Sequence, residues 1–280
     1  MTRANLKLRR IICYIILAIL TFLSLAPFLL LILNSTRLHS QLVKGFSLIP
    51  GKYFFKNLSN LLSNDNIPIT TGMLNSIIVS VANAVLGCYF SAMTAYGIHM
   101  YNFKGKGIIF KFIMAIMMIP TQVTALGFVQ LMRNLRMLNT LWPLILPAIA
   151  APVTFFYILQ YMESVLPYSI VEASRVDGCN EFRTFNVIVL PMIKPAIAVQ
   201  AIFAFVSSWN NYFMPALIIT SKSKKTIPIL IAQLRSADFM KFDLAQVYMM
   251  ICFAIVPLLI VYLCLSRYII GGVTSGGVKE

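Results

Sequence analysis

The sequence predicts an all-α integral membrane protein with six transmembrane helices and a short cytoplasmic helix-turn-helix between the fourth and fifth of them. Two observations support this fold class. Hydrophobic residues make up 59% of the 280 residues and charged residues only 11%, far from the balance of soluble domains. The apolar residues also fall into runs of about 20, the length that crosses a hydrocarbon layer about 30 Å thick.

Each predicted span is an apolar run bounded by charged or turn-forming residues. The predicted spans are Ile11–Leu33, Met73–Tyr96, Ile108–Leu131, Leu141–Gln160, Met192–Thr220 and Gln246–Leu265. The first run follows Arg9 and Arg10, as the apolar part of a signal peptide would. Its apolar part is about 23 residues long and no small-residue cleavage site follows, so we expect it to stay as a helix.

The basic residues predict the orientation of the chain. The number of Lys and Arg residues is nearly the same on the two sides of the membrane, so the orientation is inferred from the basic residues that lie closest to the spans. Lys7, Arg9 and Arg10 adjoin the first span, and Lys104 and Lys106 lie in the short connection before the third. We therefore expect a multi-pass membrane protein with both termini in the cytoplasm.

The net charge of +15 could suggest nucleic-acid binding. The 23 Lys and Arg residues, however, are spread over the termini and every connection, without a basic stripe interleaved with aromatic residues. Anionic lipid headgroups are the expected partner instead, and no nucleic acid is expected. The five cysteines show no metal-ligand spacing, so no metal site is predicted.

The chain has no visible source of energy of its own. None of the predicted spans carries an ionisable residue at its centre, where ion-coupled carriers usually keep one. The phosphate-binding pattern GxxxxGK[ST] is absent, and the C-terminal GGVTSGG lacks the lysine. We therefore predict no catalytic residue and no bound cofactor, and we expect that a partner supplies the energy for any pumping. An ion-coupled carrier or channel, and a membrane-anchored structural or regulatory protein, remain as alternatives.

One short polar stretch, residues 170–191, holds three of the eight acidic residues of the chain, Glu172, Asp177 and Glu181. A solvated connection is the simplest explanation of such a stretch. A DNA-reading helix-turn-helix is disfavoured, because the acidic residues outnumber Arg175 and Arg183 and repel phosphate.

The same stretch predicts two short helices joined by a tight turn. Ser169 and Glu172 fit the S-x-x-E capping box, so the first helix is expected to start there and to run through Arg175. Gly178 is expected to end it in a left-handed conformation. Asn180 is then expected to cap a second helix that stops at Pro191.

The spacing of these residues carries a resemblance to a known family. Glu172-Ala173-Ser174, then Gly178, then IVLP at 188–191, resembles the EAA loop of permease subunits in binding-protein-dependent ABC importers. LNSIIVSVAN, MIPTQV, LNTLWPLIL, SSWNNYFMPALIIT and YIIGGVTSGGVK resemble, in this order, the maltose-type second permease subunit of the carbohydrate branch. The sequence departs from the family at Ser174 and Cys179, where small alanines are common.

The resemblance implies a transport subunit of an ATP-driven sugar importer that lies in the bacterial cell (inner/plasma) membrane and works only in a complex. The implied partners are a second permease subunit, two ATPase subunits that carry ATP and Mg, an extracytoplasmic substrate-binding protein and membrane lipid. The implied ATPase-coupling residues are Glu172, Ala173, Ser174, Asp177 and Gly178.

The implied organisation has four parts. It comprises a cytoplasmic N-terminus with the first helix at 1–34, an external loop at 35–72, a five-helix permease core at 73–268 with the cytoplasmic EAA loop at 161–191, and a cytoplasmic Gly-rich tail at 269–280.

Polar residues inside two predicted spans are candidates for the translocation path. Trp209, Asn210, Asn211 and Tyr212 interrupt the fifth span, and Gln122, next to Pro120, interrupts the third. Interhelical hydrogen bonding is the alternative role for such side chains. The external loops 35–72 and 221–243 could contact headgroups or the binding protein, and no residue identifies the solute.

Overall fold

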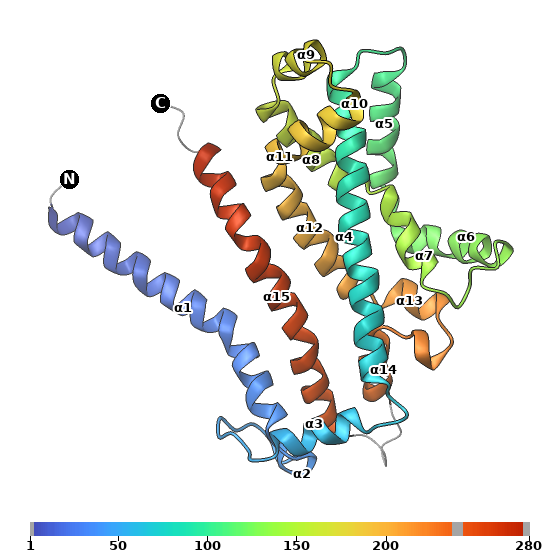
Figure 1. The fold of residues 1–280 in the computed structure, drawn as a ribbon. Coiled ribbons are helices and arrows are strands. Elements are labelled where there is room, and N and C mark those ends of the chain that lie inside the picture. Colours follow the sequence, from blue (N-terminus) through green and yellow to red (C-terminus); the bar gives the residue numbers. More distant parts are fainter. Residues whose placement is uncertain (1–2, 237–242, 277–280) are drawn as a thin grey trace. The chain divides into compact units, whose positions relative to one another are not determined.

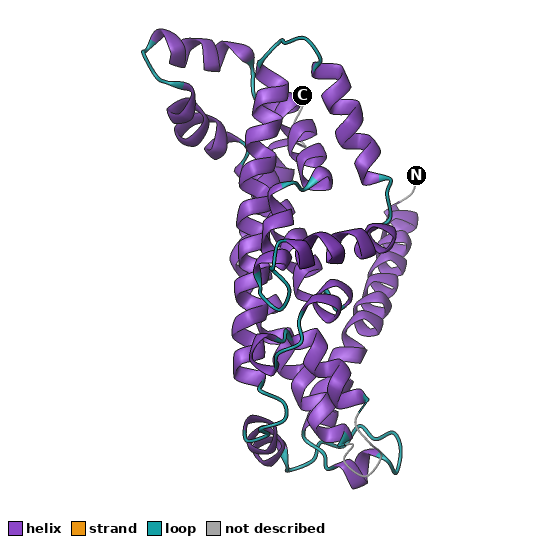
Figure 2. Ribbon diagram, turned by 90° about the vertical axis from the view of Figure 1, so that its right-hand side faces the viewer, coloured by secondary structure: helices purple, strands orange, loops and turns teal. Residues whose placement is uncertain are grey.

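The computed structural model describes residues 3–236 and 243–276, and these residues form helices joined by turns and loops (Figure 2). The helices, labelled in Figure 1, are α1 (Arg3–Ser35), α2 (His39–Leu42), α3 (Phe54–Leu62), α4 (Ile69–Met100), α5 (Lys106–Met117), α6 (Thr121–Asn134), α7 (Trp142–Ile145), η1 (Leu146–Ile149), α8 (Pro152–Val165), α9 (Tyr168–Val176), α10 (Glu181–Arg183), η2 (Thr184–Val189), α11 (Leu190–Met192), α12 (Lys194–Trp209), α13 (Phe213–Ile218), η3 (Lys222–Lys224), α14 (Ile227–Arg235) and α15 (Leu244–Gly276). The all-α prediction is confirmed for the described part of the chain.

Four helical stretches are long and apolar enough to cross a membrane. They are Arg9–Ser35, Ile69–Met100, Trp142–Val165 and Leu244–Ser266. Each exceeds the roughly 20 residues that a bilayer requires. They correspond to the first, second, fourth and sixth predicted spans.

The third predicted span is broken rather than straight. Its two halves, α5 and α6, meet at an angle of 99°. Pro120 lies at the break in an extended conformation (φ −61°, ψ 132°). Proline disfavours the helical conformation of the residue before it, so helix α5 cannot run through Ile119 into α6.

The fifth predicted span is also broken, at two points. The helical segment Glu181–Met192 meets α12 at an angle of 81°, because Pro195 cannot donate a backbone hydrogen bond to the carbonyl of Pro191. Helix α12 then ends at Trp209, and α13 begins at Phe213. The predicted interruption at 209–212 is therefore confirmed. With each bent pair taken as one span, the described helices give up to six spans.

The chain divides into two compact units, and each is described by itself. Unit 1 comprises Met1–Ile69 and Ile231–Val256, and unit 2 comprises Thr70–Leu230 and Pro257–Glu280. The predicted Gly-rich tail at 269–280 is helical as far as Gly276, and its remaining residues lie outside the described part of the chain.

Unit 1 holds residues 35–69 of the predicted external loop in a defined conformation. The buried Asn57 of α3 donates to the carbonyls of Ser35 and Arg37 at 2.8 and 2.9 Å, which ties α3 to the end of α1. Asn64 donates to the Gln246 side chain at 3.1 Å, so the loop also contacts the start of α15. These hydrogen bonds satisfy polar groups that would be costly to bury unpaired, and they hold the loop in one conformation.

Unit 2 contains the core beneath the 161–191 loop. Helix α8 contacts both α5 and α12. Ala92 and Ala95 of α4, Ile158 and Met162 of α8, and Val171 of α9 are buried together in this core. Small residues let helices approach closely, so the loop is held on a rigid base.

Candidate functional site

The 161–191 loop of unit 2 forms two short helical segments joined by a tight turn (Figure 1). The first is α9, which ends as the sequence predicts. Gly178 has φ +79°, its N–H donates to the Arg175 carbonyl, and the N–H of Cys179 donates to the Ser174 carbonyl, both at 3.0 Å. This pair of bonds is the Schellman motif, which satisfies the last carbonyls of the helix.

The predicted capping box at the start of α9 is wrong. Helix α9 begins at Tyr168, so Ser169 lies within its first turn and caps nothing. The residue at the N-cap position is Pro167, extended at φ −70° and ψ 145°, and no side chain there accepts a hydrogen bond. Proline fixes the backbone direction at the helix entry without a side-chain cap.

The second segment begins at Asn180, as predicted. Its side-chain oxygen accepts a hydrogen bond from the Arg183 N–H at 2.8 Å. The segment then runs through α10, η2 and α11, and it passes the predicted end at Pro191 by one residue to Met192.

The two segments are joined by a buried hydroxyl contact. Ser174 is 3% exposed, and its Oγ lies 3.0 Å from Oγ1 of Thr184, which is fully buried. The Ser174 hydroxyl also bonds the Val171 carbonyl at 2.7 Å. This contact leaves no room for a larger residue at position 174, which explains why a small side chain is found there.

A charged cluster fixes the turn to the end of α4. Arg175 Nε donates to Glu181 Oε1 at 2.7 Å, and the Tyr96 hydroxyl donates to Glu181 Oε2 at 2.6 Å. The Arg175 guanidinium also lies 5.5 Å from the centre of the Tyr101 ring. The hydrogen bond with Glu181 raises the pKa of Arg175 above its usual value.

Further contacts bind α9 to the same end of α4. The Tyr168 hydroxyl donates to the His99 carbonyl at 3.0 Å, and the two rings stack with centroids 5.1 Å apart. His99 Nε2 lies 3.0 Å from the carbonyl of Leu166. The loop is therefore attached to the end of α4 within unit 2, and a displacement of the loop is expected to move α4 as well.

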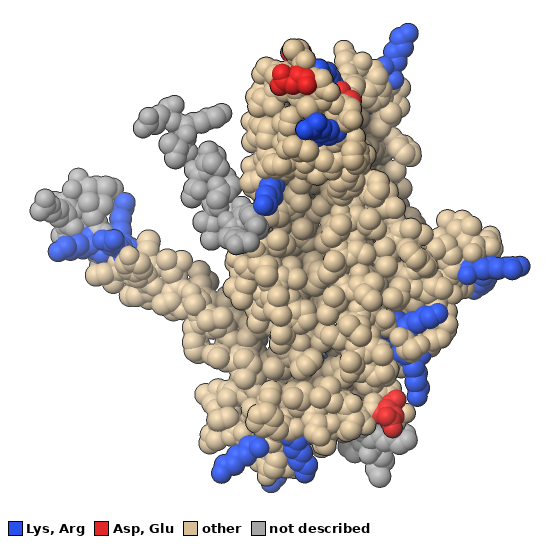
Figure 3. Space-filling view, in the orientation of Figure 1, with Lys and Arg blue, Asp and Glu red and all other residues tan. Residues whose placement is uncertain are grey.

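The outward face of the loop combines acidic and apolar side chains. Glu172, Ala173 and Asp177 are exposed, whereas Ser174 is buried and Gly178 forms the turn. Val176 and Phe182 are also exposed, at 87% and 67%. Figure 3 shows acidic side chains gathered at the end of unit 2 that carries α9, above a mostly uncharged surface.

The sequence missed several residues of this loop. Val176 and Phe182 could have been noticed as apolar residues in a polar stretch. The contacts of Glu181 with Arg175 and Tyr96 could not have been predicted from the sequence, because no helical periodicity relates residues on opposite sides of a turn.

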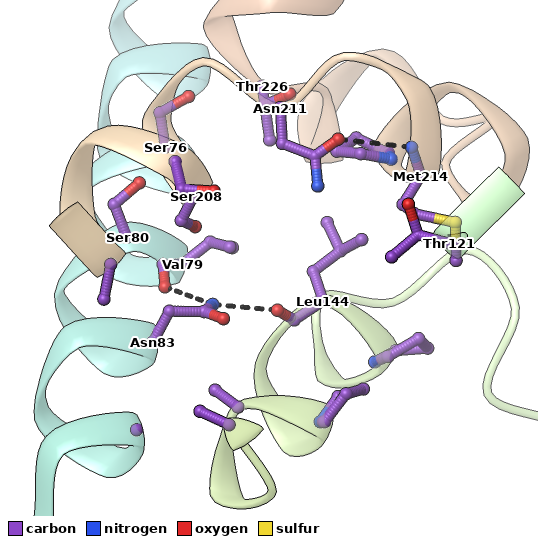
Figure 4. A pocket seen from close by; sticks show the side chains of 18 of the residues that line it. Ser76, Val79, Ser80, Asn83, Thr121, Leu144, Ser208, Asn211, Met214 and Thr226 are labelled. Carbon is purple, nitrogen blue, oxygen red and sulfur yellow. Dashed lines mark hydrogen bonds between the residues drawn. The ribbon is translucent and has the colours of Figure 1, made fainter. Parts of the chain in front are cut away.

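A second candidate site in unit 2 is a cavity of about 460 Å³ between the helices (Figure 4). Its polar lining residues are Ser76, Ser80, Asn83, Thr121, Thr124, Thr154, Ser207, Ser208, Asn211 and Thr226. Asn83 donates to the carbonyls of Val79 and Leu144 at 2.7 and 2.8 Å, which links α4 to α7 at the cavity wall.

The structure places the predicted path residues in different surroundings. Asn211 lines the cavity. Trp209 is 2% exposed and stacks on Phe205 with ring centroids 5.6 Å apart, so it belongs to the packing of α12. Gln122, Asn210 and Tyr212 are exposed and do not line the cavity. Their part in a path stays a prediction.

No site for a metal is apparent in residues 3–236 and 243–276. No group of three or more His, Cys, Asp or Glu side chains lies together there.

Comparisons with known proteins identify the family of the chain. The family model described as binding-protein-dependent transport system inner membrane component matches residues 85–274. The arabinooligosaccharides transport system permease protein AraQ of Halalkalibacterium halodurans is 35% identical over 265 residues, 94% of each chain. The lactose transport system permease protein LacG of Rhizobium radiobacter is 26% identical over 279 residues, with both chains fully covered.

A solved structure shares the fold. A chain in the crystal structure of a bacterial ABC transporter involved in the import of the acidic polysaccharide alginate superposes with a TM-score of 0.80. The match covers 96% of this chain and 98% of that one, at 21% identity. At this identity the likeness concerns the fold alone.

Proposed function

The chain belongs to the family of inner membrane components of binding-protein-dependent transport systems, and from this premise we propose that it forms the translocation path of a carbohydrate importer together with a second permease subunit. The chain is a transport subunit and not an enzyme. The names of the relatives AraQ and LacG support a sugar as the solute. ATP and Mg are bound and used by two partner ATPase subunits.

The observation that carries the proposal is the 161–191 loop on its rigid base. Its exposed residues Glu172, Ala173 and Val176 lie on α9 and Asp177 lies at the C-cap of that helix, so the loop offers a short amphipathic helix to a groove on another protein. The Tyr168 hydroxyl of α9 donates to the His99 carbonyl of α4. Arg175 of α9 donates to Glu181, which in turn accepts from the Tyr96 hydroxyl of α4. Movement of an ATPase subunit against α9 would therefore be transmitted to α4 and to the spans packed on it.

The proposal includes six membrane crossings with both termini and the loop in the cytoplasm. The confinement of the described acidic residues of unit 2 to residues 163–181 supports it, because acidic side chains need water or a partner surface. Residues 221–225 then lie outside.

Topology can be tested with a membrane-impermeant thiol reagent on intact cells. A cysteine at the exposed Ser223 is expected to react, whereas the native Cys179 is expected to react only after the membrane is opened. The reverse pattern would show that the orientation is inverted.

Transport itself is tested by reconstitution. The chain, the companion permease and the ATPase subunits, placed in vesicles with the binding protein, are expected to accumulate a labelled oligosaccharide only with ATP. Accumulation driven by a proton or sodium gradient without ATP would favour an ion-coupled carrier instead.

A further inference from the structure

The cavity of unit 2 differs chemically from an ordinary gap between helices. No residue that lines it carries a formal charge among the described residues. Hydroxyl and amide groups lie around it. Figure 4 shows Ser76, Ser80 and Asn83 on α4, Thr121 across the cavity from them, and Asn211 with its amide nitrogen directed into the space between. Such a lining offers both donors and acceptors of hydrogen bonds.

Two of the lining hydroxyls have no partner within the described chain. Ser80 is 1% exposed and Thr226 is 4% exposed, and the oxygens of both side chains are buried without a hydrogen bond. Native proteins leave few buried polar groups in this state, because each costs about 1–3 kcal/mol. Rotation of either hydroxyl toward the cavity would let a bound molecule complete its hydrogen bonding.

The amide groups of the cavity have spare capacity of the same kind. Asn211 accepts one hydrogen bond, from the N–H of Met214 at 3.4 Å, and its amide nitrogen donates to no other described residue. Asn83 uses its amide nitrogen on the carbonyls of Val79 and Leu144, and its side-chain oxygen accepts from no described residue. The amide nitrogen of Asn211 therefore remains as a donor group, and the side-chain oxygen of Asn83 as an acceptor group, for a ligand.

Apolar side chains form the rest of the wall. Phe128 of α6 and Met214 of α13 lie among the lining residues, together with Pro143 and Pro147. Mixed walls with a few polar groups are typical of small-molecule sites, whose volumes run from roughly 300 to 1,000 Å³. A sugar ring presents hydroxyl edges and C–H faces, and it can satisfy both parts of this wall.

We propose that this cavity binds an uncharged sugar directly during transport and excludes sugars that carry a phosphate or a carboxylate. The inference rests on the proposed function and narrows its substrate to neutral carbohydrates. A buried anion needs a positive partner, and no lining residue supplies one. The structural relative from an alginate importer shares the fold at 21% identity and does not transfer its acidic solute to this chain.

The proposal is tested by thiol alkylation, which measures occupancy of the cavity independently of uptake. In a complex in which the five native cysteines are replaced, Ser208→Cys places a thiol on the partly exposed lining of α12. Its alkylation rate is measured with arabinobiose, lactose, glycerol 3-phosphate or digalacturonate added. Thr94→Cys, exposed on α4 and absent from the lining, is the matched reporter. A neutral sugar is expected to slow alkylation at position 208 alone, and the anions are expected to have no effect.

Two isosteric variants identify the binding groups. Ser80→Ala and Thr226→Val remove the unpartnered hydroxyls, so neither variant should destabilise the protein. Each should weaken the protection of position 208 by the sugar about three- to tenfold, as the loss of one hydrogen bond does. Ser91→Ala is the control: this buried hydroxyl of α4 bonds the Ala151 carbonyl and does not line the cavity, so protection should be unchanged.

The outcomes separate this inference from the proposed function. ATP-dependent uptake of a neutral sugar without protection at position 208 would overturn the cavity site and leave the importer intact. Protection by an anion equal to that by a neutral sugar would overturn the exclusion. A thiol at position 208 that never reacts in the complex would show that another subunit fills the cavity, which also overturns the site. Absence of both uptake and protection would contradict the importer and the cavity together.

Discussion

The turn at Gly178 gives the sharpest prediction for the 161–191 loop. Gly178 has φ +79°, and a Cβ added there would meet no atom within 4 Å. The cost of substitution is therefore backbone strain alone, about 1–3 kcal/mol for a β-branched residue in the left-handed region. At about 1.4 kcal/mol per factor of ten, the equilibrium constant between the native turn and its alternatives would fall roughly five- to a hundredfold. Gly178→Val is expected to cut uptake severely while the chain still inserts in the membrane.

A graded series makes the cause visible. Gly178→Asn should retain most uptake, because asparagine tolerates the left-handed conformation, and Gly178→Ala should be intermediate. Gly107 is the matched control: it has an ordinary φ, and an added Cβ also meets nothing within 4 Å. Gly107→Val is therefore expected to be nearly neutral.

The assay compares uptake of labelled oligosaccharide, membrane abundance and co-purification of the ATPase subunit for each variant. Normal abundance with lost uptake and weaker co-purification would support the coupling role of the turn. Equal uptake by the Val and Asn variants would refute it, because then the left-handed turn would not matter.

Three further predictions concern the same loop and its partners. Ser174→Ala should be tolerated, whereas Ser174→Leu should overpack the contact with Thr184 and lower stability by about 1–3 kcal/mol, measured by thermal unfolding of the purified complex. Exchanging the two charges, Arg175→Glu with Glu181→Arg, should restore part of the uptake that either single change removes. The pair is about 40% exposed, so it contributes at most about 1 kcal/mol to stability. No recovery of uptake in the double variant would mean that the ion pair does not position the turn. The isolated chain should hydrolyse no ATP and acquire turnover only with ATPase subunits, and phosphate release by the pure chain would contradict the division of labour.

The sequence by itself determined the features that depend on neighbouring residues. Apolar runs identify the spans, because membrane insertion depends on the local sum of hydrophobicity. Gly178 and Asn180 predict the turn and the second helix, because caps and left-handed turns are set within a few residues. The capping box at Ser169 failed for a reason that is also local: the N-cap position is Pro167, two residues earlier than the motif implied.

Only the tertiary structure decided which distant residues meet. Tyr96 and Glu181 are 85 residues apart in the chain, and Asn83 and Leu144 are 61 apart. The polar path residues were sought in the interrupted spans, yet only Asn211 of that set lines the cavity. Ser80 lies in the second predicted span and Thr226 directly follows the basic stretch at Lys224 and Lys225, and neither segment was predicted to contribute to the path. A cavity depends on how helices pack around it. The local sequence around a serine is the same whether its side chain contacts a neighbouring helix or lines a cavity, because packing is decided only when the helices assemble.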